Sequence, residues 1–416
     1  MFNYKITELE SGIKIITENV PYVKSFALGF WFDAGSRDEN AENNGICHFL
    51  EHMLFKGTKK RSSKRISEEI ESLGGYLNAF TSKEHTCFYG RGLGQYFGYT
   101  FDVLADMVQN SSFKDSEIKK EANVIVDELN DVEDSPEELI FEKFEEEVYK
   151  ENSLRFQILG TEKNILKFRH DDFVEHSKKM YNPANMYIIS AGAVEHEKVV
   201  ALTEKYLKNM TSEKQQKREE VKTKKAGNIQ VVKDIQQVHL LMGKPTYGYT
   251  NPLRMKVNVL SHILGETSSS RLFQRLREKN GIAYQINSFL NSFSDLSTFG
   301  VYLSTNEKSI EKANALIKDE LKKMREKLVS ETELKRAKEY IKGSMIMGLE
   351  SMNNRISRMA NSIIYYGRIK SMEETIQAID CVTKEEIIEA AQTELDENNM
   401  IKVVISSKDL LKKFEN

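Results

Sequence analysis

The sequence predicts an α+β protein made of two homologous domains, each a mostly antiparallel sheet covered by helices. Three observations favour this class. The chain has 416 residues, more than the roughly 250–300 residues at which a single hydrophobic core stops growing. The same order of elements recurs in its two halves. Strand patterns also stand beside long amphipathic helix patterns without regular alternation, which is typical of a sheet covered by helices.

The recurrence rests on two pairs of segments with nearly the same spacing. The segment "SEIKKEANVIVDEL" from Ser116 matches "TELKRAKEYIKGSM" from Thr332, a shift of 216 residues. The segment "NMYIISAGA" from Asn185 matches "NMIKVVISS" from Asn399, a shift of 214 residues. Near the start of each half, "SFALGFWFDAG" and "QVHLLMGKPTYG" are both strand-like. The agreement of the two shifts predicts a duplicated domain of about 200 residues.

A charged stretch near the midpoint separates the two copies. Residues 211–227, "TSEKQQKREEVKTKKAG", contain few apolar side chains and are typical of an exposed linker. We therefore expect a first domain at 1–210 and a second domain at 228–416.

Composition excludes several classes of protein. The chain is 40% hydrophobic and 30% charged, and its formal net charge of −3 gives no footprint for nucleic acid or acidic membranes. The first residues contain no apolar signal region, and no apolar run approaches the length that spans a membrane. Cys47, Cys87 and Cys381 form no CxxC pair, which favours a reducing compartment. We expect a soluble, cytoplasmic protein that binds neither nucleic acid nor membrane.

Local patterns in the first half predict individual elements. Residues 26–33 alternate and predict a strand that ends at Gly35. The segment "SSKRISEEIESLGG" predicts a helix with Ser62 or Ser63 as its cap and Gly74 as its stop. The segments "YLNAF" and "HTCFYGRGL" predict two hairpin strands around a polar turn at 81–84.

The segment "GICHFLEHMLFKGT", residues 45–58, carries the most specific chemistry. Over 45–55 a helix places one apolar face opposite a face with His48, Glu51 and His52. The two imidazoles are one turn apart and can converge on one ion. Glu51 is adjacent to His52, where it can act as a base rather than as a ligand, in the mirror image of the H-E-x-x-H arrangement. The alternative is a polar helix face with two solvated histidines.

A catalytic zinc site needs a third protein ligand, and the segment "KKEANVIVDELND" offers two candidates. Its apolar residues form the buried stripe of a helix, namely Ile118, Ala122, Ile125 and Leu129. Glu121 and Glu128 are seven residues apart and share another face of that helix. One could bind the metal while the other holds a histidine in place. The residues by themselves do not choose between the two glutamates, and both could also be ordinary surface acids.

These residues together match a known family. The chain resembles the pitrilysin/insulinase-type zinc metallopeptidases, with the subgroup of mitochondrial processing peptidases and their bacterial relatives as the nearest match. The segment "HFLEHMLFKGT" is nearly the signature of that subgroup, and Glu128 stands at the spacing of the family's third ligand. The resemblance implies that His48, His52 and Glu128 bind one Zn2+ per chain, which would make the first domain catalytic. It also implies that Glu51 is the general base and Glu121 a supporting acid.

The resemblance extends to substrate binding. The segment "GGYLNAFTSKEHTCFYG" is similar to the edge strand on which the family lays its substrate, which implies substrate contacts at Asn78, Ala79 and Phe80. In the second half, "SSSRLFQRLREKNGIAY" is similar to the stretch that supplies an arginine and a tyrosine. Here these residues are Arg277 and Tyr284, which could donate hydrogen bonds to the scissile carbonyl.

A mild preference for arginine or lysine near the scissile bond is a further hypothesis. Glu138 and Glu142 occupy positions where the processing peptidases carry acids that receive a basic residue. Acids are abundant in "SPEELIFEKFEEEVYK", so a solvated helix face is the alternative interpretation.

The family architecture implies that one chain forms half of a clamshell, because four such domains enclose a chamber. We therefore expect a homodimer, or a heterodimer with a related subunit. The function implied is that of a zinc endopeptidase that hydrolyses short or unfolded peptides. Two alternatives are an assembly subunit that uses the same fold without catalysis and a metal-dependent hydrolase of a non-peptide substrate.

Overall fold

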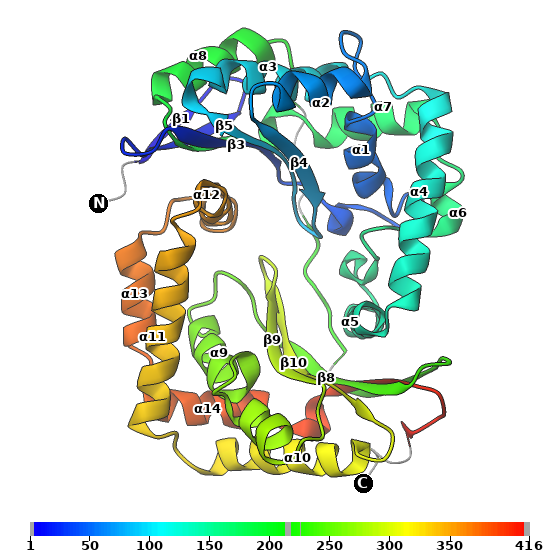
Figure 1. Ribbon diagram of the computed structural model, residues 1–416, viewed down its shortest axis with the longest axis vertical. Coiled ribbons are helices and arrows are strands. Elements are labelled where there is room, and N and C mark those ends of the chain that lie inside the picture. The colour runs from blue at the N-terminus through cyan, green and yellow to red at the C-terminus, as the bar shows by residue number, and fades with distance from the viewer. Residues whose placement is uncertain (1–3, 213–217, 225, 412–416) are drawn as a thin grey trace. The chain divides into compact units, whose positions relative to one another are not determined.

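Two compact units make up the chain in the computed structural model, which describes residues 4–212, 218–224 and 226–411 (Figure 1). The first unit comprises Met1–Asp131, Phe156–Arg218 and Gly348–Ile369. The second unit comprises Val132–Arg155, Glu219–Met347 and Lys370–Asn416. Each unit contains one mostly antiparallel sheet with helices packed on it, which confirms the predicted α+β class.

The first sheet has six strands in the order β1-β2-β6-β3-β5-β4. Its neighbours are antiparallel except for the parallel pair β2 and β6. The strands are β1 (Tyr4–Glu8), β2 (Lys14–Asn19), β3 (Ser25–Phe32), β4 (Tyr76–Thr81), β5 (Thr86–Leu93) and β6 (Met186–Gly192).

The second sheet has five strands in the order β7-β11-β8-β10-β9. The pair β7 and β11 is parallel, and the other neighbours are antiparallel. The strands are β7 (Gly227–Val232), β8 (Gln237–Tyr247), β9 (Gln285–Ser292), β10 (Leu296–Asn306) and β11 (Ile401–Ser406).

The two sheets have the same topology once β1 is set aside. The strands β2, β6, β3, β5 and β4 correspond in order and direction to β7, β11, β8, β10 and β9. The strand-like segments matched between the halves are β3 with β8 and β6 with β11. The predicted duplication is therefore visible in the fold.

Helices cover both sheets. Those of the first unit are α1 (Ile46–Leu54), α2 (Ser63–Glu71), α3 (Phe97–Asn110), α4 (Asp115–Asp134, whose last turn is assigned to the second unit), α6 (Glu162–Ile165), α7 (His170–Met180), α8 (His196–Leu207) and α12 (Met352–Tyr366). Those of the second unit are α5 (Pro136–Val148), α9 (Arg254–Ser261), α10 (Ile310–Glu326), α11 (Glu331–Gly348), α13 (Met372–Asp380) and α14 (Lys384–Glu394). The second unit also contains two π-helical segments, η5 (His262–Glu266) and η6 (Phe273–Lys279).

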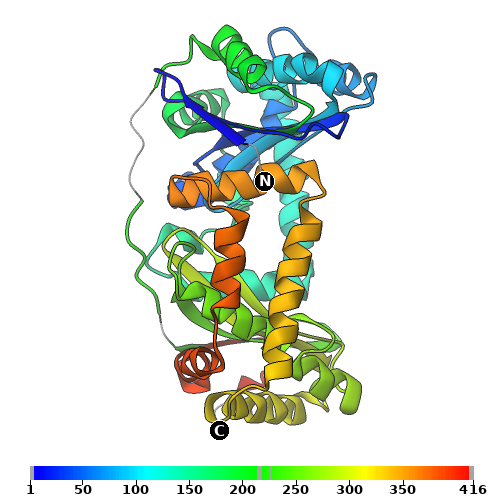
Figure 2. The same cartoon turned by 90° about the vertical axis from the view of Figure 1, so that its left-hand side faces the viewer.

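Central strand β3 shows why helices lie on both faces of a sheet. Alternate residues of a strand point to opposite faces. Leu28 and Phe30 point to one face and join the core that is formed with α1, α3 and α7. Trp31 points to the other face and packs with Met359 and Ile363 of α12. Figure 2 shows α12 lying along this second face of the first sheet.

The compact units differ from two continuous halves of the sequence in two segments. The domain limits predicted at 1–210 and 228–416 keep α5 with the first copy and α12 with the second. In the structure α5 packs on β8 and β11 through Phe144, and α12 packs on β3 and β6. The physical reason is that both sheets carry apolar side chains on both faces, so each needs a second cover.

Most local predictions in the first half are confirmed, although β3 ends at Phe32, three residues before the predicted end at Gly35. Ser62 caps α2 by accepting a hydrogen bond from the Arg65 amide, and Gly74 follows the helix with a φ of 68°. Strands β4 and β5 pair in antiparallel register from Tyr76↔Arg91 to Thr81↔Thr86.

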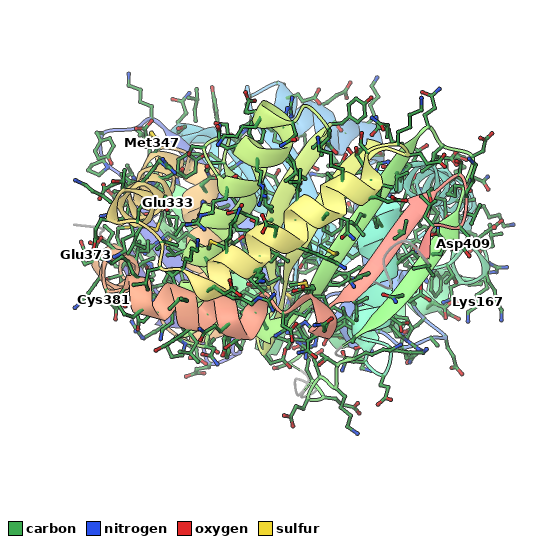
Figure 3. The ribbon with its side chains drawn as sticks, turned by 90° about the horizontal axis from the view of Figure 1, so that it is seen from below. Lys167, Glu333, Met347, Glu373, Cys381 and Asp409 are labelled. Atoms are coloured by element: carbon green, nitrogen blue, oxygen red, sulfur yellow. The ribbon has the colours of Figure 1, made fainter. Side chains whose placement is uncertain are left out.

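Part of the predicted linker at 211–227 lies outside the described residues, namely 213–217 and 225. Arg218 is held in the first unit, where its guanidinium lies 2.8 Å from carboxylate oxygens of Asp33 and Asp38. Cys381, at the end of α13, is exposed (Figure 3). Within the described ranges, no helix combines the length and the apolar character needed to cross a membrane.

Candidate metal centre

Helix α1 presents the histidines because its other face is buried. Gly45, at the N-terminus of the helix, has a φ of 100° and lies so close to Gly160 that a Cβ atom would meet its Cα at 2.8 Å. The buried Glu39 carboxylate accepts hydrogen bonds at 2.8 Å from the amides of Gly45 and Cys47. The buried residues of α1 are Ile46, Cys47, Phe49, Leu50, Met53 and Leu54. This leaves His48, Glu51 and His52 on the opposite side.

Helix α4 brings the two glutamates to the same region. Ile118, Ala122 and Ile125 are buried as predicted, and Leu129 is half-buried against the same core. Glu121 is buried, whereas the side chain of Glu128 is 39% exposed.

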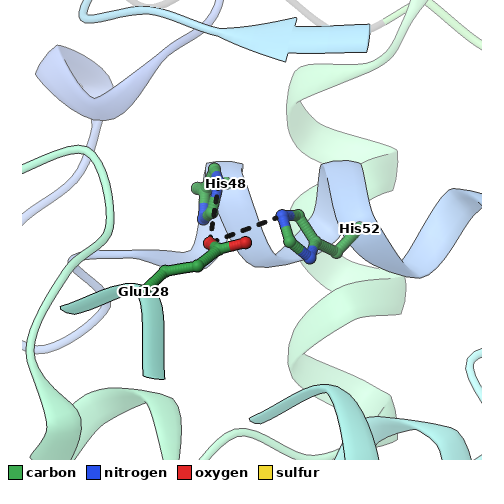
Figure 4. A group of neighbouring side chains, drawn as sticks. All are labelled: His48, His52 and Glu128. Carbon is green, nitrogen blue, oxygen red and sulfur yellow. Dashed lines mark ion pairs between the residues drawn. The ribbon is translucent and has the colours of Figure 1, made fainter. Parts of the chain in front are cut away.

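Three side chains form one group of potential metal ligands. The donor atoms of His48, His52 and Glu128 all lie within 4.8 Å of one another. Each Nε2 atom lies 3.8 Å from Oε2 of Glu128 (Figure 4). Two imidazoles and one carboxylate are a donor set that catalytic zinc uses, with a fourth position left open. The three residues therefore fit a zinc ion, and Glu121 is not one of the group.

Glu121 instead contacts the far side of His52. Its Oε1 atom lies 2.9 Å from Nδ1 of His52, and its Oε2 atom lies 2.6 Å from Nζ of Lys56. Burial opposes ionisation of Glu121, but its bonds with His52 and Lys56 hold its pKa below the usual range. A carboxylate in this position fixes the ring orientation of a ligand histidine and leaves its Nε2 atom free to bind metal.

The two histidines differ in their surroundings. Burial lowers the pKa of His48 to about 3, so its imidazole is neutral at neutral pH. Its Nδ1 atom is buried and has no hydrogen-bond partner among the described residues. Burial also opposes the charge on His52, but the hydrogen bond with Glu121 and the charges of Glu128 and Glu51 raise its pKa above the usual value. Nδ1 of His52 is thus held by Glu121, whereas no described residue forms a hydrogen bond with Nδ1 of His48.

Glu51 lies beside the ligand group without joining it. Its Oε2 atom accepts a hydrogen bond of 2.6 Å from the Thr81 hydroxyl. Burial raises the pKa of Glu51, and the Thr81 bond acts in the opposite direction. A carboxylate with a raised pKa next to a metal group is suited to accept and return a proton.

Strand β4 is an edge of the first sheet. It carries Asn78, Ala79 and Phe80, of which Asn78 is exposed and the other two are half-buried. Phe80 packs against Trp31 with ring centroids 5.4 Å apart. An edge strand of this kind can accept an extended peptide as an additional strand.

Arg277 and Tyr284 lie together in the second unit, whereas the histidines lie in the first. The Arg277 guanidinium donates a hydrogen bond of 3.0 Å to the Tyr284 carbonyl and lies over the Phe273 ring. Tyr284 is 55% exposed. Arg277 belongs to the π-helical segment η6, and such segments are often found at functional sites.

Glu138 and Glu142 lie on α5 in the second unit. Glu138 is exposed in the first turn of α5, where its negative charge interacts favourably with the helix dipole and stabilises the helix. Glu142 is half-buried. The structure thus supplies a local role for Glu138 that needs no substrate.

The sequence patterns did not single out three residues that support this candidate centre. Thr81 binds Glu51, Lys56 binds Glu121, and Glu39 caps α1. Lys56 lies two residues beyond the end of α1, so only its closeness in sequence to His52 could have suggested it. Glu39 and Thr81 reach α1 only through the folding of neighbouring segments, which no local period encodes.

Two family models match the chain. Residues 14–162 match the insulinase family, described as peptidase family M16. Residues 167–341 match a model described as the peptidase M16 inactive domain.

Curated relatives and solved structures agree with these models. The chain is 37% identical to an uncharacterised zinc protease of Rickettsia bellii over 94% of each chain. It is 35% identical to an uncharacterised zinc protease of Bacillus subtilis, with 91% of this chain and 92% of the relative covered. A protease from Helicobacter pylori has a similar structure, with a TM-score of 0.91, 20% identity, and 97% and 99% of the two chains covered. A Pseudomonas fluorescens structure described as a peptidase M16 inactive domain gives a TM-score of 0.90 at 19% identity, with 98% and 99% covered.

Proposed function

Because the chain belongs to the insulinase family of peptidases, M16, and is a zinc metallopeptidase, we propose that it is an endopeptidase for short or unfolded peptides. The observation that carries this proposal is the group of His48, His52 and Glu128, whose donor atoms lie within 4.8 Å of one another. Membership of the subgroup of mitochondrial processing peptidases stays a prediction.

In this proposal the three residues hold one zinc ion per chain. Bound zinc would act as a Lewis acid that lowers the pKa of water and polarises the scissile carbonyl. Glu121 keeps His52 in the tautomer that presents Nε2, because its carboxylate accepts the proton of Nδ1. Lys56 in turn balances the charge of Glu121.

Glu51 is the proposed general base. Its carboxylate is half-buried beside the ligand group and is held by Thr81. It would accept a proton from the attacking water and pass it to the leaving amine.

The substrate is proposed to bind as an extended strand along β4, with contacts at Asn78, Ala79 and Phe80. The main-chain groups of an edge strand give affinity for any extended peptide, which fits a preference for short or unfolded chains. Arg277 and Tyr284 are proposed to donate hydrogen bonds to the substrate carbonyl. Glu138 and Glu142 are proposed to favour arginine or lysine near the cleaved bond.

A homodimer in which four domains enclose the substrate is the proposed assembly, with a heterodimer as the alternative. A cytoplasmic location is part of the same proposal. Sedimentation of the purified protein and fractionation of its cells would test the two statements separately.

Profiling of a peptide mixture by mass spectrometry tests the proposed activity. The zinc-loaded wild type should cleave peptides, and Glu51→Gln should cleave them at least ~100-fold more slowly, because general acid–base catalysis contributes roughly 10²–10⁴-fold. Glu117→Gln is a matched control, since Glu117 lies on α4 and pairs only with Lys120 among the contacts described for it. Equal cleavage by wild type and Glu51→Gln would contradict the role of Glu51.

Metal analysis provides a second test of the same centre. His52→Ala should lose zinc, whereas Glu51→Gln should retain it, because His52 belongs to the proposed ligand group and Glu51 does not. If the zinc-loaded wild type cleaved no peptide, the proposed endopeptidase activity would be contradicted.

A further inference from the structure

The base Glu51 is oriented by a side chain from the edge strand. Thr81, the last residue of β4, donates a hydrogen bond of 2.6 Å from Oγ1 to Oε2 of Glu51. Within the described part of the chain, this is the one side-chain hydrogen bond that Glu51 receives. The terminal torsion of a glutamate has a broad energy profile, so its carboxylate rotates easily unless a partner fixes it.

The backbone around Thr81 is itself fixed. Thr81 pairs with Thr86 across the hairpin, and the turn that follows is closed by a hydrogen bond of 2.8 Å from the Ser82 amide to the His85 carbonyl. The Ser82 carbonyl also accepts a hydrogen bond from the Ser36 amide. The hydroxyl of Thr81 is therefore presented from a braced position and can hold the carboxylate in one orientation.

The hydrogen bond also joins two functional elements. Helix α1 carries the ligand histidines and Glu51, and β4 carries the residues along which the peptide is proposed to lie. A hydroxyl that occupies one carboxylate oxygen leaves the other, Oε1, free to accept a proton. The strand and the base consequently keep a fixed relative position.

We propose that Thr81 is a positioning residue that holds the Glu51 carboxylate in its working orientation and fixes it relative to the edge strand. This inference rests on the proposed function of Glu51 as the base. It adds a specific requirement at position 81: a hydroxyl group, supplied by threonine or serine.

Kinetics of two variants at position 81 test whether a hydroxyl group is required there. Thr81→Val keeps the shape of the side chain but removes the hydroxyl, and Thr81→Ser keeps the hydroxyl. We expect Thr81→Val to lower kcat roughly 10- to 100-fold with KM changed less than about twofold, since a misplaced catalytic group costs up to ~100-fold. Thr81→Ser should stay within about threefold of wild type. Zinc content should be unchanged in both.

Thr86→Val is the matched structural control. Thr86 is the cross-strand partner of Thr81, and its buried hydroxyl donates to the Ala34 carbonyl at 2.9 Å rather than to Glu51. We expect this variant to lower the melting temperature but to leave kcat near that of wild type. A kcat in Thr81→Val equal to wild type, or a loss in Thr81→Ser as large as in Thr81→Val, would overturn the proposal.

Crystal structures give a readout that does not depend on activity. The Glu51 carboxylate should have one orientation in wild type and in Thr81→Ser, and a rotated or split orientation in Thr81→Val. An unchanged Glu51 in Thr81→Val overturns the positioning role. If Glu51 rotates but wild type and Glu51→Gln cleave peptides equally, the positioning is real and the proposed role of Glu51 as the base fails.

Discussion

The two units share a sheet but differ in chemistry. Strand order and direction are the same in both sheets apart from β1. Helix α1 of the first unit carries His48, Glu51 and His52, and residues at a shift of 214 in the second half are His262, Gly265 and Glu266. The second unit therefore keeps one histidine and has other residues in place of the proposed base and of the second proposed ligand.

The second helix of the site differs in the same way. At the shift of 216 that relates α4 to α11, Glu121 and Glu128 correspond to Ala337 and Ser344. In place of a ligand group, Nε2 of His262 lies 2.9 Å from Glu266. The sheet therefore depends on many apolar residues, whereas the candidate metal centre depends on a few side chains on two helices.

The covering helices offer the first test of this comparison. Ile363 of α12 is buried against the first sheet in the same cluster as Trp31, the single tryptophan of the chain. We expect Ile363→Ala to lower the free energy of unfolding of the first unit by about 2–5 kcal/mol, because it leaves a cavity. Urea denaturation followed by Trp31 fluorescence measures this change. Phe144→Ala, buried in the second unit, should move the Trp31 transition less; a larger shift would contradict the assignment.

Replacing His52 by the residue at the corresponding position of the second unit should strongly weaken zinc binding. His52→Glu places at position 52 the residue found at 266. Zinc affinity should fall more than ~100-fold, because loss of a ligand should exceed the 10–100-fold typical of an outer-shell change. Competition with a zinc chelator measures it. The reverse variant, Gly265→Glu with Glu266→His, should bind no additional zinc, since Ala337 and Ser344 supply no carboxylate.

Removing the residue that pairs with Glu121, the neighbour of His52, should lower zinc affinity less. Lys56→Met removes the ammonium group that lies 2.6 Å from Glu121. We expect zinc affinity to fall roughly 10- to 100-fold, with partial recovery in Lys56→Arg. Lys120→Met on α4 is the control, because the exposed Lys120 pairs with Glu117 and not with Glu121. Equal zinc affinity in Lys56→Met and Lys120→Met would show that Lys56 does not act through Glu121.

The smallest expected effect concerns the loss of stability of the first unit at acidic pH. Burial lowers the pKa of His176 to about 3 from an ordinary value near 6.5. Between these values the unfolded chain binds the additional proton, so this contribution to stability is present above about pH 6.5 and is lost as the pH falls. His176→Gln should reduce the slope of unfolding free energy against pH by up to ~1.4 kcal/mol per pH unit between pH 5 and 6. The Trp31 transition measures this slope, and an unchanged slope would contradict the prediction.

Local patterns in the sequence determined many of the elements and the candidate residues of the metal centre. The period at which apolar residues recur along the sequence predicted α1, α2 and β3. The i, i+4 spacing put His48 and His52 on one helical face. The repeated spacing of segments also predicted two related sheets. These features follow from neighbours along the chain, so they can be read without a structure.

Only the tertiary structure decided the rest. From the residues alone, Glu121 and Glu128 are equivalent candidates; packing of α4 against α1 puts Glu128 among the donor atoms and Glu121 behind His52. The contact of Thr81 with Glu51 and the packing of α12 on the first sheet likewise join residues far apart in sequence. Contacts of this kind depend on how whole elements pack, and no local periodicity specifies them.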